Sequence, residues 1–137
     1  MAVPLKDLGR AIKRMQDRHH RTADARLASL GTTLVQWDAL RHIAEYPDSS
    51  SHQLAQLTFQ TDQSFGTLAT RLVERGLIDR TPGPGRAIRH RLTAAGTKLL
   101  KTATTQVEAV LAESFAPLSS AERETLWALL GKLLAAG

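Results

Sequence analysis

The chain has 137 residues, of which 42% are hydrophobic and 23% charged, so its composition excludes a disordered chain and favours one globular domain. Its formal net charge of +5 at pH 7 favours a polyanionic partner, although charge alone does not choose between DNA, RNA and a membrane. The absence of cysteine excludes disulfides, thiolate nucleophiles and Cys-based zinc sites.

The positive charge is unevenly distributed along the chain. Residues 1–26 hold seven Lys/Arg against three Asp/Glu, residues 60–91 hold six against three, and residues 106–137 hold two against four. The N-terminus lacks the apolar core of a secretion signal, and no apolar run approaches about 18 residues. We therefore expect a cytoplasmic protein without a membrane partner, whose basic character lies in two segments.

Two helices are expected before residue 47. The first runs from Leu5 to about Gly31, because apolar residues recur at three- and four-residue steps opposite a Lys/Arg-rich face. That apolar stripe consists of Leu5, Leu8, Ile12 and Met15, and His19 takes its next place. The second helix runs from Val35 to Tyr46 and is ended by Pro47. Its expected inward residues are Trp37, Leu40, Ile43 and Ala44.

Two short helices are expected next, separated by a few residues. Ser50 and Gln53 have the spacing of a capping box, which predicts a third helix of about two turns. The fourth helix takes Thr61 or Asp62 as its N-cap and ends at Gly76. Its buried stripe is Phe65, Leu68, Ala69 and Leu72, and the opposite face presents Gln63, Thr67, Thr70, Arg71 and Glu74.

A basic β-hairpin follows over residues 78–93, which read IDRTPGPGRAIRHRLT. A Pro/Gly tip separates two extended stretches, as is typical of a hairpin. Alternation along the second strand places Arg89 and Arg91 on the face opposite Ile88, His90 and Leu92.

Two helices complete the chain. The first runs from Ala94 to about Phe115 and is broken by Pro117, and the last opens with a capping box at Ser119 and Glu122. Together with the N-terminal helix they carry more apolar surface than one small core covers. Two-fold pairing is the commonest way to bury such surface, which predicts a homodimer; the alternative is a monomer that folds these helices onto itself.

This order of elements predicts a mainly α fold with a small β-wing, in which terminal helices flank a winged helix–turn–helix core. In such a core the second short helix enters the major groove of DNA, and the hairpin lies beside it against the backbone or the minor groove. Gln, Thr and Arg side chains suit base edges and phosphates. A polar helix face is also typical of an ordinary solvated helix, but its place between a capped helix and an arginine-rich hairpin favours DNA binding.

Several stretches in order resemble the MarR family of transcriptional regulators. They are TLVQWDALR at residues 33–41, Leu54-Ala55, TRLVERGLIDR at 70–80 and RHRLTAAG at 89–96. The resemblance implies one domain over 1–137, with dimerisation helices at 1–30 and 94–137 and a winged helix–turn–helix at 33–93. It also implies a homodimer that binds a pseudo-palindromic operator in duplex DNA, usually as a repressor relieved by a small-molecule effector.

The resemblance and the helix pattern together assign candidate DNA-binding residues. Those expected at the major groove are Gln63, Ser64, Thr67, Thr70 and Arg71, and those expected near phosphate are Arg80, Arg89 and Arg91. Arg86 matches the arginine that family members insert into the minor groove, but Pro84 stands where they carry an acidic partner. Either proline and glycine fix the tip by restricting the backbone, or the wing is weakened and specificity rests on the helix.

The remaining candidates concern ligands and chemistry. Met15, His19, Trp37 and Arg41 are the expected effector contacts, since they offer an aromatic wall and cationic groups. No histidine pair has metal-ligand spacing, and no catalytic motif is present, so neither a metal site, a cofactor nor an enzyme is expected. The alternative function is a winged-helix protein-interaction module that has weakened or lost operator binding.

Overall fold

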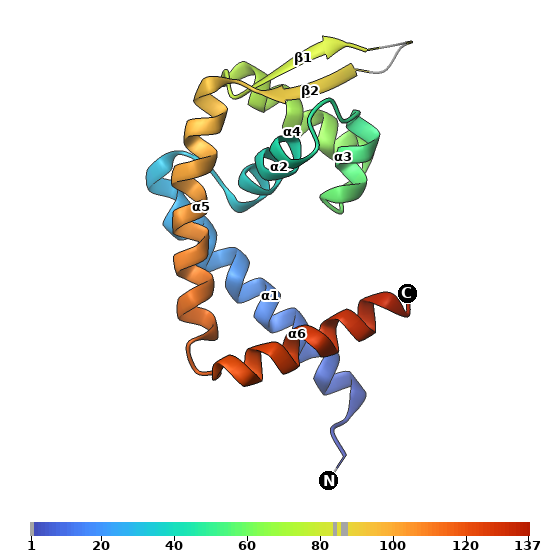
Figure 1. The fold of residues 1–137 in the computed structure, drawn as a ribbon, viewed down its shortest axis with the longest axis vertical. Helices are drawn as coiled ribbons and strands as arrows, with labels where there is room; N and C mark the ends of the chain where they lie inside the picture. Colours follow the sequence, from blue (N-terminus) through green and yellow to red (C-terminus); the bar gives the residue numbers. More distant parts are fainter. Residues whose placement is uncertain (1, 84, 86–87) are drawn as a thin grey trace.

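The computed structural model describes residues 2–83, 85 and 88–137, and it combines α-helices with one two-stranded hairpin (Figure 1). In chain order the elements are α1 (Leu5–Leu27), the 3-10 turn η1 (Ala28–Leu30), α2 (Leu34–Glu45), α3 (Ser51–Leu57), α4 (Asp62–Glu74), β1 (Ile78–Pro82), β2 (Ile88–Leu92), α5 (Ala94–Phe115) and α6 (Ser120–Ala135). These bounds confirm the predicted order of helices and hairpin, with differences of one or two residues at most of the ends.

The predicted helix caps are confirmed in detail. The side chains of Ser50 and Ser119 each form a complete capping box, and Thr61 accepts a hydrogen bond from the backbone N–H of Ser64. At the other ends, Gly31 and Gly76 adopt left-handed φ angles of 72° and 71°, a conformation that costs glycine little. Local sequence signals therefore set where most of these helices begin and end.

The winged core is the region of α2, α3, α4 and the hairpin. Phe65 and Leu72 of α4 are fully buried against Leu54 of α3 in its main hydrophobic cluster. Ile78 of β1 belongs to the same cluster, so the hairpin is anchored on the helices that precede it. This packing fixes which face of α4 points outward.

The two strands pair antiparallel, with Ile78 opposite Leu92 and Arg80 opposite His90. Directly opposite residues of an antiparallel pair lie on the same face of the sheet. Because Ile78 and His90 are both buried, Arg80 lies on the inward face of the hairpin. The outward face holds the pairs Asp79–Arg91 and Thr81–Arg89.

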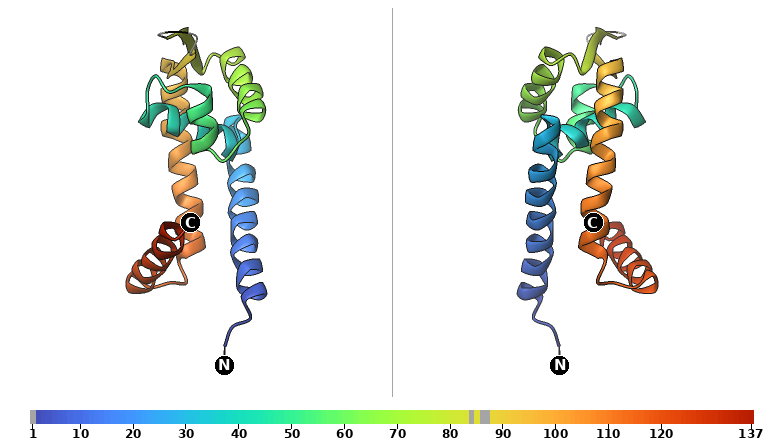
Figure 2. Two further views of the ribbon diagram at one scale, coloured as in Figure 1. Left: turned by 90° about the vertical axis from the view of Figure 1, so that its right-hand side faces the viewer. Right: turned by 90° about the vertical axis from the view of Figure 1, so that its left-hand side faces the viewer.

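The terminal helices extend away from this core. α1 packs along α5, where Leu27, Ala103 and Val107 form a second buried cluster. α6 overlaps α1 in Figure 1, but the views of Figure 2 separate the two helices. No residue of α6 is buried, and Trp127 and Leu134 are each 80% exposed. Both ends of the chain thus present apolar side chains that the fold of one chain leaves uncovered.

One expectation about packing was wrong. Ala44 was predicted to face inward from α2, but it is exposed, and the buried positions of that helix include Ala39, Leu40, His42 and Ile43. The rotation of α2 is set by its simultaneous contacts with α3, α5 and β2, which its own apolar spacing does not specify.

Among the described residues, none of the helices combines the length and the apolar character that a membrane span requires.

Candidate nucleic-acid interface

The outward face of α4 is the candidate surface for DNA. The buried residues Phe65, Leu68, Ala69 and Leu72 hold one side of the helix against the core. The opposite side is exposed and includes all five residues predicted for the major groove: Gln63, Ser64, Thr67, Thr70 and Arg71. Four of them, with the N-cap Thr61, line a polar hollow of about 310 Å³.

The hydrogen bonds on this face determine what it offers to a base edge. The hydroxyl of Thr67 donates to the carbonyl of Gln63 at 3.2 Å, and that of Thr70 donates to the carbonyl of Gly66 at 3.0 Å. Since both hydroxyl protons are used within the helix, the threonine oxygens present acceptor lone pairs outward. Arg71 lines the same hollow as Thr67, so a guanidinium donor and a hydroxyl acceptor for base edges lie close together.

The hairpin stands beside α4 as the candidate wing (Figure 1). Its tip includes Pro84 and Arg86, which lie outside the described residues, so the prediction of a minor-groove arginine is not tested. Arg89 lies on the outward face and is partly buried against Gly83, where an added Cβ would collide with the Arg89 side chain. The outward side of β2 thus carries a cation near the tip.

Arg91 also lies on the outward face, but its guanidinium pairs with a carboxylate. Its Nε and Nη2 atoms donate to the two carboxylate oxygens of Asp48 at 2.7 and 2.6 Å. The hydrogen bond from Arg91 holds the pKa of Asp48 below its ordinary value. Asp48 lies in the loop between α2 and α3 at a φ of 68°, and its backbone N–H donates to the carbonyl of His90. Arg91 therefore connects the base of the wing to the helix–turn–helix. Because Asp48 partly neutralises its positive charge, less of that charge is available to attract phosphate.

His90 makes the second such connection. Its ring is fully buried, its Nδ1 lies 2.9 Å from the carbonyl oxygen of Ser49, and its edge meets the ring of Phe65 with centroids 5.9 Å apart. Burial lowers the pKa of His90, and the positive charge of Arg80 acts in the same direction against the hydrogen bond to Ser49. His90 thus links β2 to the loop between α2 and α3 and to α4.

Arg80 was predicted near phosphate, yet it reaches inward to α4. Its Nη2 donates to the carbonyl of Gly66 at 3.2 Å, and its Nη1 lies 3.4 Å from the hydroxyl of Thr70. The sequence contained a signal for this orientation. Because side chains alternate along a strand, an inward Ile78 implies an inward Arg80 two residues later.

The four predicted effector residues are not brought together in one place. The Cζ atom of Arg41 lies 5.1 Å from the centre of the Trp37 ring, and the indole N–H of Trp37 donates to the hydroxyl of Thr104 on α5. His19 contacts Ser114 of α5 instead, at 2.6 Å. Ten residues of helix span about 15 Å, so His19 and Trp37 contact α5 far apart. Met15 is partly buried on α1 and does not line the hollow that includes Trp37.

That hollow, of about 450 Å³, lies between α1, the start of α2 and the turn before α4. His20 lines it, together with Trp37 and Phe59. Phe59 is 96% exposed and holds a left-handed φ of 56°, which is unusual for a bulky residue. Neither His20 nor Phe59 was predicted to line such a hollow. His20 is off the apolar stripe of α1, and nothing in the local pattern around Phe59 indicates an exposed aromatic side chain.

Comparison with known proteins agrees with this architecture. A model of the MarR family matches residues 30–87. The HTH-type transcriptional repressor Rv2887 of Mycobacterium tuberculosis is 32% identical over 111 residues, which cover 80% of each chain. Crystal structures of that MarR family protein with p-aminosalicylic acid and with DNA share 30% and 28% identity and have a TM-score of 0.77; each covers 96% of this chain and 98% of the other.

A mutant of MarR from E. coli in complex with operator DNA has a TM-score of 0.87 at 24% identity, which indicates the same fold; the match covers 93% of this chain and 94% of that chain. The similarity to Rv2887 extends beyond the winged core into the terminal helices. With its polar α4 face, its adjoining hairpin and this similarity over most of its length, the chain belongs to the MarR family of transcriptional regulators.

Proposed function

We propose that the protein is a sequence-specific repressor that binds duplex DNA as a homodimer and is released by a small aromatic ligand. The observation that carries this proposal is the face of α4, where buried Phe65 and Leu72 orient the polar hollow outward. Support comes from the relative Rv2887, whose structures include one with DNA. In this proposal α4 enters the major groove, with Arg89 near phosphate and Arg86 at the minor groove.

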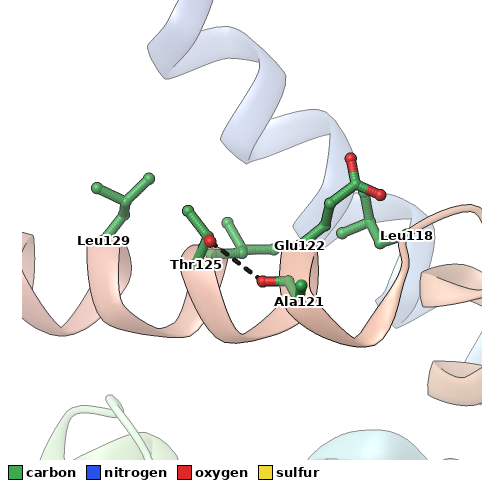
Figure 3. A pocket seen from close by; sticks show the side chains of 6 residues that line it. Leu118, Ala121, Glu122, Thr125 and Leu129 are labelled. Carbon is green, nitrogen blue, oxygen red and sulfur yellow. Dashed lines mark hydrogen bonds between the residues drawn. The ribbon is translucent and has the colours of Figure 1, made fainter.

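The homodimer is proposed from the exposed apolar faces of the terminal helices. Leu5 is 82% exposed on α1, and Trp127 is 80% exposed on α6. Leu118, Thr125 and Leu129 line a hollow of about 410 Å³ along α6. Figure 3 shows Leu129 next to Thr125 on this helix, with Leu118 at its start beside Glu122. A second copy that covers these surfaces leaves residues 33–93 for DNA, with 1–30 and 94–137 as dimerisation helices.

A mobility-shift titration against the region upstream of the protein's own gene tests the proposal. We expect a sequence preference at moderate salt, and Arg71→Ala should cost about 1–3 kcal/mol on the preferred duplex. Arg21→Ala is the matched control, because Arg21 is an exposed arginine paired with Asp17 on α1. Equal affinity of the wild type for all duplexes would contradict sequence-specific regulation.

The wing is tested separately, with Arg86→Ala. A minor-groove arginine should contribute to affinity and to its salt dependence, so the slope of log affinity against log salt should fall by about one. If the protein is instead an interaction module that has lost operator binding, Arg86→Ala should change neither its affinity for DNA nor the salt dependence of that affinity. An unchanged slope with full affinity would assign recognition to α4 alone.

The effector is proposed to bind in the hollow of Trp37, His20 and Phe59. The exposed Phe59 ring lies two residues before the N-cap Thr61, so a ligand that covers it contacts the start of the recognition helix. The relative Rv2887 is known in complex with p-aminosalicylic acid, which makes an aromatic acid the appropriate probe. The hollow offers aromatic surface and polar groups from His20 and Gln60 for such a molecule.

A thermal-shift titration with p-aminosalicylic acid tests this site. We expect His20→Ala and Phe59→Ala to reduce the ligand-induced shift, while His19→Ala lowers the melting temperature itself and keeps the shift. His19 is the matched control because its ring contacts Ser114 and Phe115 on α5. A shift lost in His19→Ala and kept in His20→Ala would place the ligand elsewhere.

A further inference from the structure

The side chain of Arg80 lies between the wing and the recognition helix. It shares the inward face of the hairpin with its opposite partner His90, which is fully buried. Its Nε atom is also buried and has no hydrogen-bond partner among the described residues. Arg80 is therefore directed into the protein, unlike Arg89 on the outward face.

The terminal nitrogens of Arg80 meet α4 at one turn of the helix. The carbonyl of Gly66 accepts from Nη2 of Arg80 at 3.2 Å and from the hydroxyl of Thr70 at 3.0 Å. The same hydroxyl oxygen lies 3.4 Å from Nη1 of Arg80. These three contacts join β1, the backbone of α4 and a side chain of its DNA-facing surface in one small network.

This network controls the orientation of Thr70. Its hydroxyl proton is directed to the Gly66 carbonyl, and one lone pair of its oxygen faces Arg80. The rotamer is thereby held, and the second lone pair keeps one direction on the outward face. Thr67, one turn earlier, donates to the carbonyl of Gln63, and no described residue of the wing forms a hydrogen bond with it.

The contact also couples two parts that meet DNA at different places. α4 and the wing are separate elements, and the geometry between them decides whether both grooves are reached at once. Arg80 connects the strand that begins the wing to the middle of α4 through a charged donor, and hydrogen bonds to charged groups are the stronger ones.

We propose that Arg80 is a positioning residue for operator discrimination: it fixes α4 and the Thr70 side chain relative to the wing, and it does not serve as a phosphate contact. This inference rests on the proposed function as a DNA-binding repressor. It assigns Arg80 and Arg89, two arginines of one hairpin, opposite roles that follow from the faces on which they lie.

Binding to a preferred and an unrelated duplex over a salt series separates the two roles. Arg80→Ala should lower the ratio of the two affinities about tenfold and leave the salt slope unchanged. Arg80→Lys keeps the charge but not the planar fork, and it should not restore the ratio. The matched control Arg89→Ala should weaken both duplexes equally and lower the slope by about one. A lowered slope in Arg80→Ala, restored by lysine, would overturn the proposal.

Hydrogen exchange in the absence of DNA supplies an independent measurement. Arg80→Ala should speed exchange of α4 amides near Gly66 and Thr70, whereas Arg89→Ala should leave them unchanged. If the wild type prefers no duplex, the proposed function fails, while faster exchange would still support the positioning contact. Unchanged exchange in Arg80→Ala would overturn the positioning role whatever the DNA result.

Discussion

The winged core and the terminal helices differ in how completely a single chain buries their apolar side chains. In the core, Phe65, Leu54 and Ile78 are buried in one shared cluster, and buried His90 joins the wing to the helices. In α6 no residue is buried, and α1 buries only Ala23 and Leu27. The surface that reads DNA can therefore be oriented within one chain, whereas the apolar helices acquire a hydrophobic interior only against another surface.

The largest expected effect concerns the joint between these regions. A Cβ on Gly96, in the first turn of α5, would collide with the carbonyl oxygen of Leu77, which lies between α4 and β1 in the winged core. Backbone cannot move aside as a side chain does, so Gly96→Ala should cost about 3 kcal/mol of unfolding free energy. Chemical denaturation measures it, with Gly9→Ala as the control, since a Cβ there has no neighbour within 4 Å. An equal loss of unfolding free energy in Gly96→Ala and Gly9→Ala would show that α5 and Leu77 can move apart to accept the added Cβ.

The second prediction tests the incompleteness of the terminal helices. Because Trp127 is 80% exposed in one chain, Trp127→Ala should scarcely change the folding of that chain but should weaken dimerisation by about 2 kcal/mol, or roughly thirtyfold. Sedimentation across a concentration series measures the dissociation constant. Tyr46→Ala is the control, because Tyr46 is 45% exposed on the winged core. A monomeric wild type, or equal constants in both variants, would remove α6 from the interface.

A third, smaller effect contrasts Gly66 with Gly96. Both are helical, but a Cβ at Gly66 would meet nothing within 4 Å. Gly66→Ala should stabilise the core by about 0.5–1 kcal/mol, because glycine loses more backbone freedom on folding. The same methyl group would project beside the DNA-facing surface and should weaken operator binding. Stabilisation with full affinity would mean that DNA does not approach α4 closely at this turn.

The smallest effect is a pH dependence of the core. Burial keeps the pKa of His90 below the ordinary histidine value of about 6.5, so the unfolded chain binds a proton more readily than the folded one. The contribution of His90 to the free energy of unfolding should therefore be constant above about pH 6.5 and should fall as the pH drops below it. His90→Gln should flatten this part of a plot of melting temperature against pH, whereas exposed His52→Gln should not. If melting temperature falls equally with pH in the wild type and in His90→Gln, the pH dependence does not come from His90.

Much of the site followed from local pattern. Ser50 and Thr61 marked the starts of α3 and α4, and the spacing of Phe65, Leu68 and Leu72 identified the outward face that carries Thr67 and Arg71. Such signals act within a few residues, so the chain needs no distant contact to express them. The protein partners of Arg80 and Arg91 could not be predicted from local pattern, because they lie 14 and 43 residues away.

By itself, the sequence determined the order of elements, the caps and the polar face of α4, since these depend on side-chain type and helical or strand period. Only the tertiary structure decided that Arg91 pairs with Asp48, that Arg80 holds Gly66, and that His19 contacts Ser114 while its neighbour His20 lines the hollow of Trp37. Adjacent helical residues point about 100° apart, so a small rotation of α1 exchanges their surroundings. That rotation is set by packing against α5, whose Ser114 lies 95 residues after His19.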